Sequence, residues 1–362
     1  MNQQRIEESV NKLFNINKNN YIFVYTPPKV GSTTLVTSLR VSLSENYNII
    51  HVHDEIMLSV LSGIYDVKIN DIIHFLSNKG KNVYVIDVYR TPIERKMSEY
   101  FEKLSPYHFN NTEDNITKYS IKRISDRFNK LFPHLENGDH YFDYYNIGNP
   151  IPFDFEKKYT VQEINNVKYI KLRLCDAELW GTILSSILKQ DIVIIQDYKT
   201  EDKGIGELYK RFKNEYKLPS NYIELIKSCK YLKFYYNELE RNKYIQMWSQ
   251  RLGDYFTPYT ASEYIFYMNL CLENQYINDI QLEHYIDNGC SCKYCNEKRK
   301  EIFLKAKSGE KHFQKIIHSE VVNEVKNEKV KEIGVKMKNL INNEMSKNKF
   351  KPNQFKINLT NK

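Results

Sequence analysis

Strand and helix patterns alternate between residues 20 and 200, and this alternation restricts the fold more than any other feature of the sequence. Tyr21–Thr26 is a short, nearly continuous apolar run, which is typical of a parallel strand buried on both faces of a sheet. Further strands are predicted at Asn48–His53, Asn82–Tyr89, Val167–Leu174 and Ile192–Asp197. With helices between them, these strands predict one open, mainly parallel α/β domain that has helices on both faces and ends near residue 250.

The helices between the strands are predicted from apolar residues at helical spacing. Such segments are Thr33–Ser44, Ile69–Asn78, Ile116–Phe132 and Ala177–Leu188. The helix after the third strand has the clearest start. There Thr91 is predicted as the N-cap, Pro92 as the first helical residue and Glu94 as the partner that completes a capping box.

Composition limits the broad class of the protein. The chain has 362 residues, which is long enough for two or three domains, and its 41% hydrophobic content excludes a collagen-like, wholly disordered or membrane-embedded chain. It contains no apolar run of membrane-spanning length and no apolar segment near its start, so we expect a cytoplasmic protein without a membrane span. The net charge of +8 suits an anionic ligand, although a solvated lysine-rich surface explains it equally well.

The loop after the first predicted strand, PPKVGSTT, has the composition of an oxyanion site. A loop between a strand and a helix N-terminus presents backbone N–H groups and the positive end of the helix dipole. Gly31 allows close backbone approach, and Lys29 adds a full charge. The candidate anion-binding residues are Lys29, Val30, Gly31, Ser32, Thr33 and Thr34. A plain strand-to-helix turn with hydroxyl caps is the alternative.

A second anion site is predicted after the third strand. Arg90 ends that strand, and Ser98 follows on the second turn of the next helix. Ligands of open parallel sheets bind beyond the carboxyl ends of the strands, so Arg90 and Ser98 are placed to hold a second phosphate. The alternative is an ion pair between Arg90 and a helix carboxylate such as Glu94.

These two segments resemble those of PAPS-dependent sulfotransferases. PPKVGSTTL is similar to their 5′-phosphosulfate loop, and YRTPIERKMSEYF is similar to their 3′-phosphate segment, with its Arg-x-Pro-x-x-Arg pattern and downstream Ser. The resemblance is nearest to the carbohydrate type, meaning the heparan/uronyl 2-O-sulfotransferases and related capsular-polysaccharide-synthesis proteins. As an architecture it covers roughly residues 20–250. One departure is Thr91, where the family more often has Asp or Asn.

The resemblance implies a P-loop-like sulfotransferase fold, PAPS as co-substrate, PAP as product and a carbohydrate hydroxyl as acceptor. It also implies that the residues from Lys29 to Thr34 hold the 5′-phosphosulfate, while Arg90 and Ser98 hold the 3′-phosphate. Lys29 would in addition stabilise charge on the bridging oxygen as the sulfuryl group leaves.

The second strand supplies candidates for a general base. Alternation places His51 and His53 on one face, and His53 lies nearest the carboxyl end of the strand. A histidine can be a neutral base at physiological pH, so His53 is predicted to take the acceptor proton, with His51, Asp54 or Glu55 as an alternative base or an orienting partner. The resemblance implies a His or a Glu as general base, because His serves in the 2-O type and Glu in other glycan sulfotransferases. A hydrogen-bonded structural pair is the other interpretation of the two histidines.

The region after residue 250 is predicted to be separate and mostly helical. Half of the six cysteines lie within six positions, and His284, Cys290, Cys292 and Cys295 could form one structural zinc site over residues 251–318. Cys271, His312 or His318 could replace His284, and a loop with free thiols is the alternative. The other three cysteines, Cys175, Cys229 and Cys271, are predicted to be core residues.

The last segment, residues 319–362, is predicted as a lysine- and asparagine-rich helix with a loose tail. Its apolar stripe could pair with a second copy of the chain and so form a homo-oligomer.

Three functions follow from these features. The first is sulfuryl transfer from PAPS to a carbohydrate hydroxyl with a histidine base. The second is a P-loop-type nucleotide kinase or NTPase, but that motif places its lysine after the second glycine, whereas Lys29 precedes Gly31. The third is a non-catalytic sulfotransferase-like binding protein whose basic tail contacts a protein or nucleic acid. No nucleic-acid-binding motif is evident, so a nucleic-acid partner is not expected.

Overall fold

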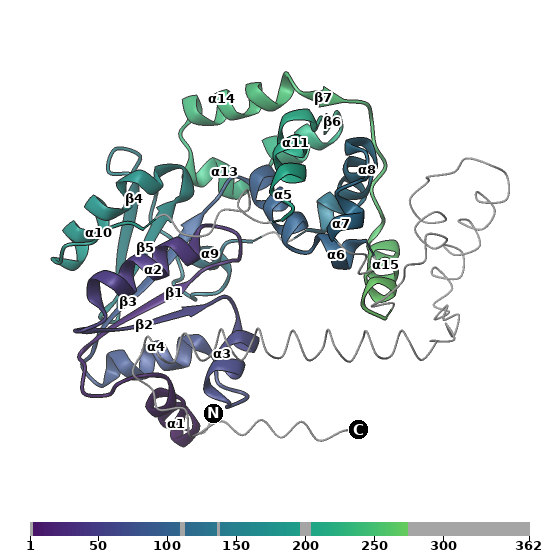
Figure 1. The fold of residues 1–362 in the computed structure, drawn as a ribbon. Coiled ribbons are helices and arrows are strands. Elements are labelled where there is room, and N and C mark those ends of the chain that lie inside the picture. Colours follow the sequence, from purple (N-terminus) through teal and green to yellow (C-terminus); the bar gives the residue numbers. More distant parts are fainter. Residues whose placement is uncertain (1–2, 109–112, 136–137, 196–203, 274–362) are drawn as a thin grey trace. The chain divides into compact units, whose positions relative to one another are not determined.

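The computed structural model describes residues 3–108, 113–135, 138–195 and 204–273 (Figure 1). Within it, Met1–Cys271 groups as one compact unit. The predicted zinc ligands His284, Cys290, Cys292 and Cys295 and the predicted helix and tail over residues 319–362 lie outside the described residues.

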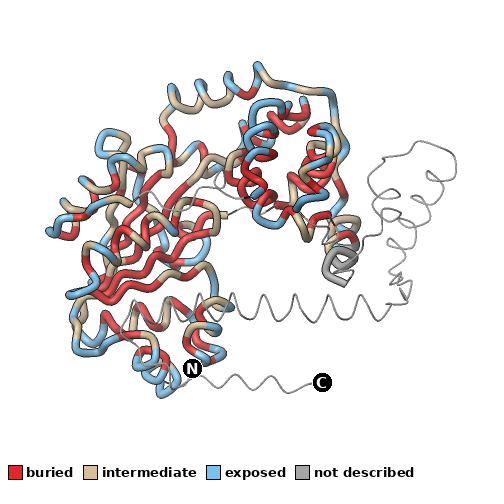
Figure 2. Tube along the Cα trace, in the orientation of Figure 1, coloured by how far each residue is buried: buried red, intermediate tan, exposed pale blue. Residues whose placement is uncertain are grey.

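A five-stranded sheet forms the centre of this unit, in the order β2-β1-β3-β5-β4. Four strands are parallel, and β4 pairs antiparallel with β5 at one edge. The strands are β1 Asn20–Tyr25, β2 Tyr47–Val52, β3 Asn82–Tyr89, β4 Tyr159–Ile164 and β5 Val167–Arg173. Figure 2 shows that the central strands are buried along most of their length. The predicted α/β class with a mainly parallel sheet is therefore confirmed.

Helices cover both faces of the sheet because alternate strand residues point to opposite sides. Phe23 and Val85 belong to a core with α1, α3, α4 and α9, whereas Ile22 and Val24 belong to a core with α2 and α10. The bounds of these helices are α1 Gln3–Leu13, α2 Ser32–Leu43, α3 Glu55–Ser62, α4 Ile69–Asn78, α9 His140–Asp143 and α10 Trp180–Leu188.

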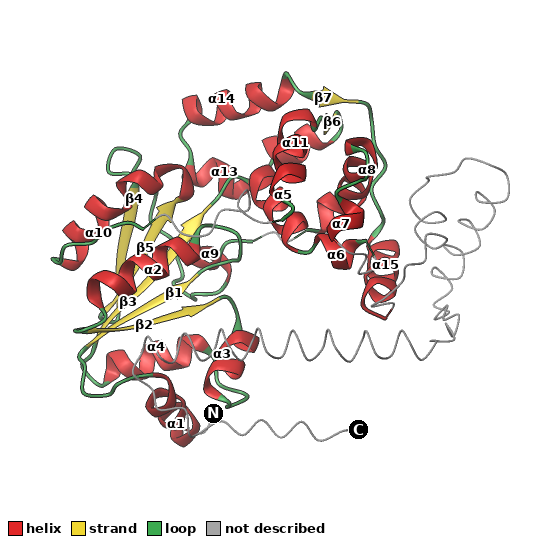
Figure 3. Cartoon of the chain, in the orientation of Figure 1, coloured by secondary structure: helices red, strands yellow, loops and turns green. Residues whose placement is uncertain are grey.

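The remaining helices gather in a group beside the sheet (Figure 3). They pack around aromatic rings, and Phe128 lies edge-on to Tyr100, Phe212 and Tyr216. These helices are α5 Pro92–Glu102, α6 Leu104–Tyr107, α7 Glu113–Ile116, α8 Ile121–Leu131, α11 Gly206–Glu215, α12 Tyr222–Lys227, α13 Lys230–Tyr235, α14 Glu238–Ser249 and α15 Ala261–Glu273. Short elements complete the fold: η1 Phe132–His134, η2 Leu174–Leu179, β6 Leu218–Pro219 and β7 Leu252–Gly253.

The strand predicted at Ile192–Asp197 is wrong in its described part. The backbone N–H groups of Ile192, Val193 and Ile195 donate to the hydroxyls of Ser185, Ser42 and Ser38 respectively. Serine side chains of α10 and α2 thus satisfy donors that a strand would use in a sheet ladder. The strand β4, which was not predicted, forms the edge of the sheet beside β5.

Two predicted helix starts need correction. Pro92 does begin α5, but the capping box is wrong because the Glu94 carboxylate accepts hydrogen bonds from Tyr244 and Trp248 of α14, at 2.7 and 3.2 Å. The helix predicted at Ile116–Phe132 starts later than expected, because Ile116 is the last residue of α7 and α8 begins at Ile121. Ser120 ends the break, since its hydroxyl caps α8 by accepting from the N–H of Arg123.

Candidate functional site

The strand order contains a switch point, which is the place where ligands bind in other open α/β sheets. The chain passes from β1 to β2 on one side and then returns to β3 on the other, so the switch point lies between the carboxyl ends of β1 and β3. The loop that contains Lys29 and Gly31 follows β1, and Arg90 follows β3. Both predicted anion-binding segments therefore flank this switch point.

The two segments are in direct contact. The Arg90 guanidinium donates a hydrogen bond of 2.9 Å from Nη1 to the backbone carbonyl of Lys29. The sequence predicted that Arg90 holds a second phosphate together with Ser98 or, alternatively, that it pairs with Glu94. In the structure the Glu94 carboxylate accepts hydrogen bonds from α14 instead, and Arg90 donates to the loop.

The Lys29 side chain extends to α5. Its ammonium lies 3.1 Å from the Glu102 carboxylate, and 17% of the side chain is exposed. Glu102 stands four residues after the buried Ser98, so both lie on the same face of the helix. Lys29 and Ser98, the serine predicted to hold the 3′-phosphate, therefore both lie near this face of α5. Sequence reasoning did not identify Glu102.

Gly31 has a backbone conformation that favours glycine, with φ +88°. A Cβ atom at this position would lie 2.7 Å from the Leu174 side chain and 3.3 Å from the Trp180 ring. Trp180 is buried and held by a 3.1 Å hydrogen bond from its Nε1 to the Arg173 carbonyl. The Trp180 ring, which cannot move freely, therefore fills the space beside Gly31. The neighbouring Val30 is fully buried.

We expect Gly31→Ala to lower the free energy of unfolding by about 1–3 kcal/mol more than Gly80→Ala, because overpacking adds to the cost of the backbone conformation. Gly80 is a matched control, since its φ is +73° but a Cβ there would meet no atom within 4 Å. Urea denaturation measures both. Equal losses for the two variants would show that the packing against Trp180 is unimportant.

His53 is held as a neutral imidazole at the end of β2. Its Nδ1 lies 2.7 Å from the carbonyl oxygen of Thr26. A carbonyl only accepts, so Nδ1 carries the hydrogen and the lone pair is on Nε2. Burial lowers the pKa of His53, and the nearby charges of Lys29 and Arg95 lower it further, against the hydrogen bond to Thr26 and the charge of Asp54.

The alternative bases have other roles in the structure. Burial lowers the pKa of His51 to about 3. The Asp54 carboxylate caps α3 by accepting a 2.8 Å hydrogen bond from the N–H of Met57. The Glu55 carboxylate accepts from the N–H of Ile69 at 3.3 Å, and its pKa is raised, chiefly by burial.

Two further groups beside His53 were not assigned from the sequence. His140 of α9 lies with Nε2 2.7 Å from the backbone carbonyl of His53. Arg95 is buried in α5 and donates to the Gly138 carbonyl at 2.7 Å. Arg95 is the last residue of the Arg-x-Pro-x-x-Arg pattern, so the sequence motif could have identified it as a site residue. His140 comes from a distant segment without a motif.

A buried charge cluster lies behind α9. Lys171 of β5 stands opposite Asp87 of β3 in the sheet register, and its ammonium contacts the Asp87 carboxylate at 2.5 Å and also the Asp139 carboxylate. The Tyr235 hydroxyl donates to Asp139 at 2.7 Å. Burial raises the pKa of Asp87 to about 7; Lys171 opposes this effect, and Asp139 adds to it.

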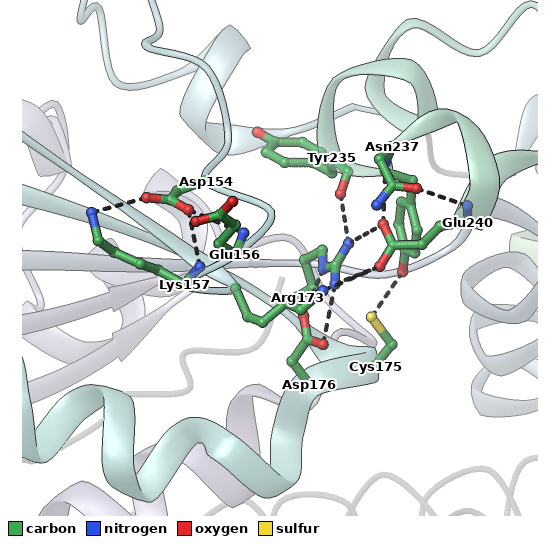
Figure 4. A network of polar contacts seen from close by, with 11 residues as sticks. Asp154, Glu156, Lys157, Arg173, Cys175, Asp176, Tyr235, Asn237 and Glu240 are labelled. Carbon is green, nitrogen blue, oxygen red and sulfur yellow. Dashed lines mark hydrogen bonds and ion pairs between the residues drawn. The ribbon is translucent and has the colours of Figure 1, made fainter.

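Arg173, at the end of β5, belongs to a separate polar network (Figure 4). Its guanidinium contacts Asp176 at 2.6 Å, and it contacts Glu240 and the Tyr235 carbonyl at 2.9 Å each. Glu240 also forms a capping box with Asn237 at the start of α14. Arg173 thereby ties α13 and α14 to the sheet.

Cys175, beside this network, was predicted to be a core residue. This prediction is wrong, because Cys175 is exposed. The Tyr236 hydroxyl donates to its sulfur at 3.2 Å. Cys229 is only half-buried.

The described residues show neither a metal site nor a membrane span. They hold no group of three or more His, Cys, Asp or Glu side chains placed to bind a metal ion. Zinc binding by the cysteine cluster stays a prediction, since those residues are outside this part of the chain. No helix in the described ranges is both long enough and apolar enough to cross a membrane.

No protein-family model, curated protein or solved structure matches this chain. A function is therefore inferred from the switch point of the sheet and from the two segments that meet there.

Proposed function

We propose that the chain is a PAPS-dependent sulfotransferase that transfers the sulfuryl group to a hydroxyl of a carbohydrate acceptor. The observation that carries this proposal is the hydrogen bond between Arg90 and the Lys29 carbonyl. It joins the segment similar to a 3′-phosphate site with the segment similar to a 5′-phosphosulfate loop, at the switch point of the sheet. One adenylate donor carries both of these anionic groups.

In this proposal the donor is held by charges and by a helix end. Lys29 and the N-terminus of α2, with Ser32, Thr33 and Thr34, bind the 5′-phosphosulfate, while Arg90 and Ser98 bind the 3′-phosphate. In the free protein Lys29 pairs with Glu102, which is 39% exposed. A partly exposed ion pair contributes about 0–1 kcal/mol, so an anionic donor can compete for the lysine.

The proposed reaction is an in-line displacement. His53 takes the proton of the acceptor hydroxyl at Nε2, and the oxygen attacks sulfur. The bond between sulfur and the bridging oxygen of the 5′-phosphate breaks, and PAP leaves with the electron pair. Lys29 and the N-terminus of α2 stabilise the negative charge that develops on the leaving phosphate. The Thr26 carbonyl accepts from Nδ1 throughout and so stabilises the imidazolium that forms.

Calorimetry with PAP and AMP tests donor binding. We expect PAP to bind more tightly than AMP, which lacks the 3′-phosphate. We expect Arg90→Ala to lower PAP affinity about 10–100-fold, as for the loss of a hydrogen bond to a charged group, without changing AMP affinity. Lys29→Ala should lower the affinity for both. Arg5→Ala is the control, since Arg5 is exposed and pairs with Asp66.

Two results would contradict the proposed donor site. One is PAP binding no tighter than AMP, and the other is indifference of PAP affinity to both substitutions. Magnesium-dependent binding of ATP in place of PAP would favour the kinase or NTPase alternative.

A further inference from the structure

His53 is held through two separate hydrogen bonds. Its ring donates from Nδ1 to the Thr26 carbonyl, and its own backbone carbonyl accepts from Nε2 of His140, each at 2.7 Å. Thr26 follows β1, His53 follows β2 and His140 begins α9. Three elements thus converge on one residue, and both its side chain and its backbone are restrained.

The His140 ring can make this contact in only one tautomer. The His53 carbonyl accepts, so Nε2 of His140 must carry the hydrogen. The ring packs against Tyr25 and Tyr144, with centroid distances of 4.8 and 4.7 Å. Burial lowers the pKa of His140 to about 4, so the ring is neutral near pH 7. Its Nδ1 is buried without a hydrogen-bond partner among the described residues.

The buried charge cluster fixes α9 and therefore His140. The N–H of Tyr141 donates to the Asp87 carboxylate at 3.1 Å, and the N–H of Phe142 donates to the Asp139 carboxylate at 3.3 Å. Lys171 contacts both carboxylates. A helix of four residues has little stability alone, so its position depends on these buried contacts.

We propose that His140 is a positioning residue for His53: its Nε2–H group holds the His53 carbonyl and thereby keeps the His53 ring on Thr26, with the lone pair on Nε2. The inference rests on the proposed function, in which that lone pair receives the acceptor proton. The charged and titratable groups that act on His53 from its neighbours are Lys29, His51, Asp54, Arg95 and His140 itself. Within this set, His140 is the group that donates to the His53 carbonyl in the described part of the chain.

Nitrogen-15 NMR of histidine-labelled protein tests the inference without any substrate, because long-range proton–nitrogen spectra distinguish a protonated ring nitrogen from a bare one. In the wild type we expect only the Nδ1–H tautomer at His53 and only the Nε2–H tautomer at His140. His140→Gln retains an amide donor near the position of Nε2, so His53 should keep its single tautomer. His140→Asn is too short to reach the carbonyl, so both tautomers of His53 should appear. His74→Gln, on α4, is the matched control and should change neither residue.

The inference is overturned if His140 carries its hydrogen on Nδ1 in the wild type, or if a folded His140→Asn variant leaves His53 in one tautomer. The wild-type spectrum can overturn the inference even if His140→Asn fails to fold. Turnover provides a second measurement, since a misplaced base can cost about 10²-fold in rate. We expect that loss in kcat for His140→Asn with the KM for PAPS unchanged, and rescue by Gln. Absence of PAP binding would remove the proposed function, whereas the tautomers of His53 would still be decided by the spectra.

Discussion

Lys171→Met is expected to lower the free energy of unfolding by about 3–5 kcal/mol, because it leaves the carboxylates of Asp87 and Asp139 buried without their cation. Lys171 and Asp87 are fully buried, and Asp139 is 1% exposed. A methionine of similar length fills the volume of the lysine stem, so the loss reports on charge and not on a cavity. Urea denaturation at pH 7 measures it.

The matched control for this variant is Lys168→Met on the same strand. Its side chain is half-buried, and its ammonium lies 5.6 Å from the centre of the Tyr84 ring, so we expect a loss of about 1 kcal/mol or less. The loss for Lys171→Met should also depend on pH. Burial already raises the pKa of Asp87 to about 7, and removal of the cation raises it further. Protonation at pH 5 neutralises the carboxyl, so the loss should be smaller at pH 5 than at pH 8. Equal losses at positions 171 and 168 would show that the cluster does not need its lysine.

The sequence could reveal the strands that carry this cluster but not the cluster itself. Asn82–Tyr89 and Val167–Leu174 are recognisable as buried strands from their apolar residues. The pairing of Asp87 with Lys171 depends on the β3–β5 register, which is set by contacts between segments 84 residues apart. A single charged residue within a strand gives no indication of its partner across the sheet.

The strand β4 was missed, and a strand was predicted at Ile192–Asp197, for a local reason. Ile192–Asp197 is more apolar than Tyr159–Ile164, so its composition favours a strand there. The position of β4 follows instead from the two-residue connection Asn165-Asn166, whose φ angles of +50° and +61° fit the turn that favours a β-hairpin. This pair of asparagines was the available signal for β4.

The two segments that meet at the switch point were easier to predict from the sequence than the residues around them. Lys29 lies in the loop after β1 and Arg90 directly follows β3, and adjacent parallel strands bring such segments together. Glu102, Arg95 and His140 reach the same region from helix faces and from a distant segment, and their approach depends on how α5 and α9 pack on the sheet. Local patterns do not contain that information.

His53→Gln is expected to lower turnover about 10²–10⁴-fold, the usual contribution of a general base, while PAP affinity stays within about twofold. The glutamine amide is similar in size to the ring, but it has no lone pair of comparable basicity. For the wild type, burial holds the pKa of His53 below its ordinary value. The base form therefore predominates at pH 7, and kcat/KM should fall only as the pH drops below about 6.5. This fall of kcat/KM at low pH, the acidic limb of the pH profile, should be absent in His53→Gln.

The control for this experiment is His74→Gln, which removes a histidine of α4 and should retain both the rate and the acidic limb. Measurement requires labelled PAPS, a carbohydrate acceptor and initial rates from pH 5 to 8. Full turnover in His53→Gln would transfer the role of base to another group, and Glu55 is then the first to test because its pKa is raised by burial. An acidic limb that persists in His53→Gln with reduced turnover would mean that His53 positions the acceptor but does not take its proton.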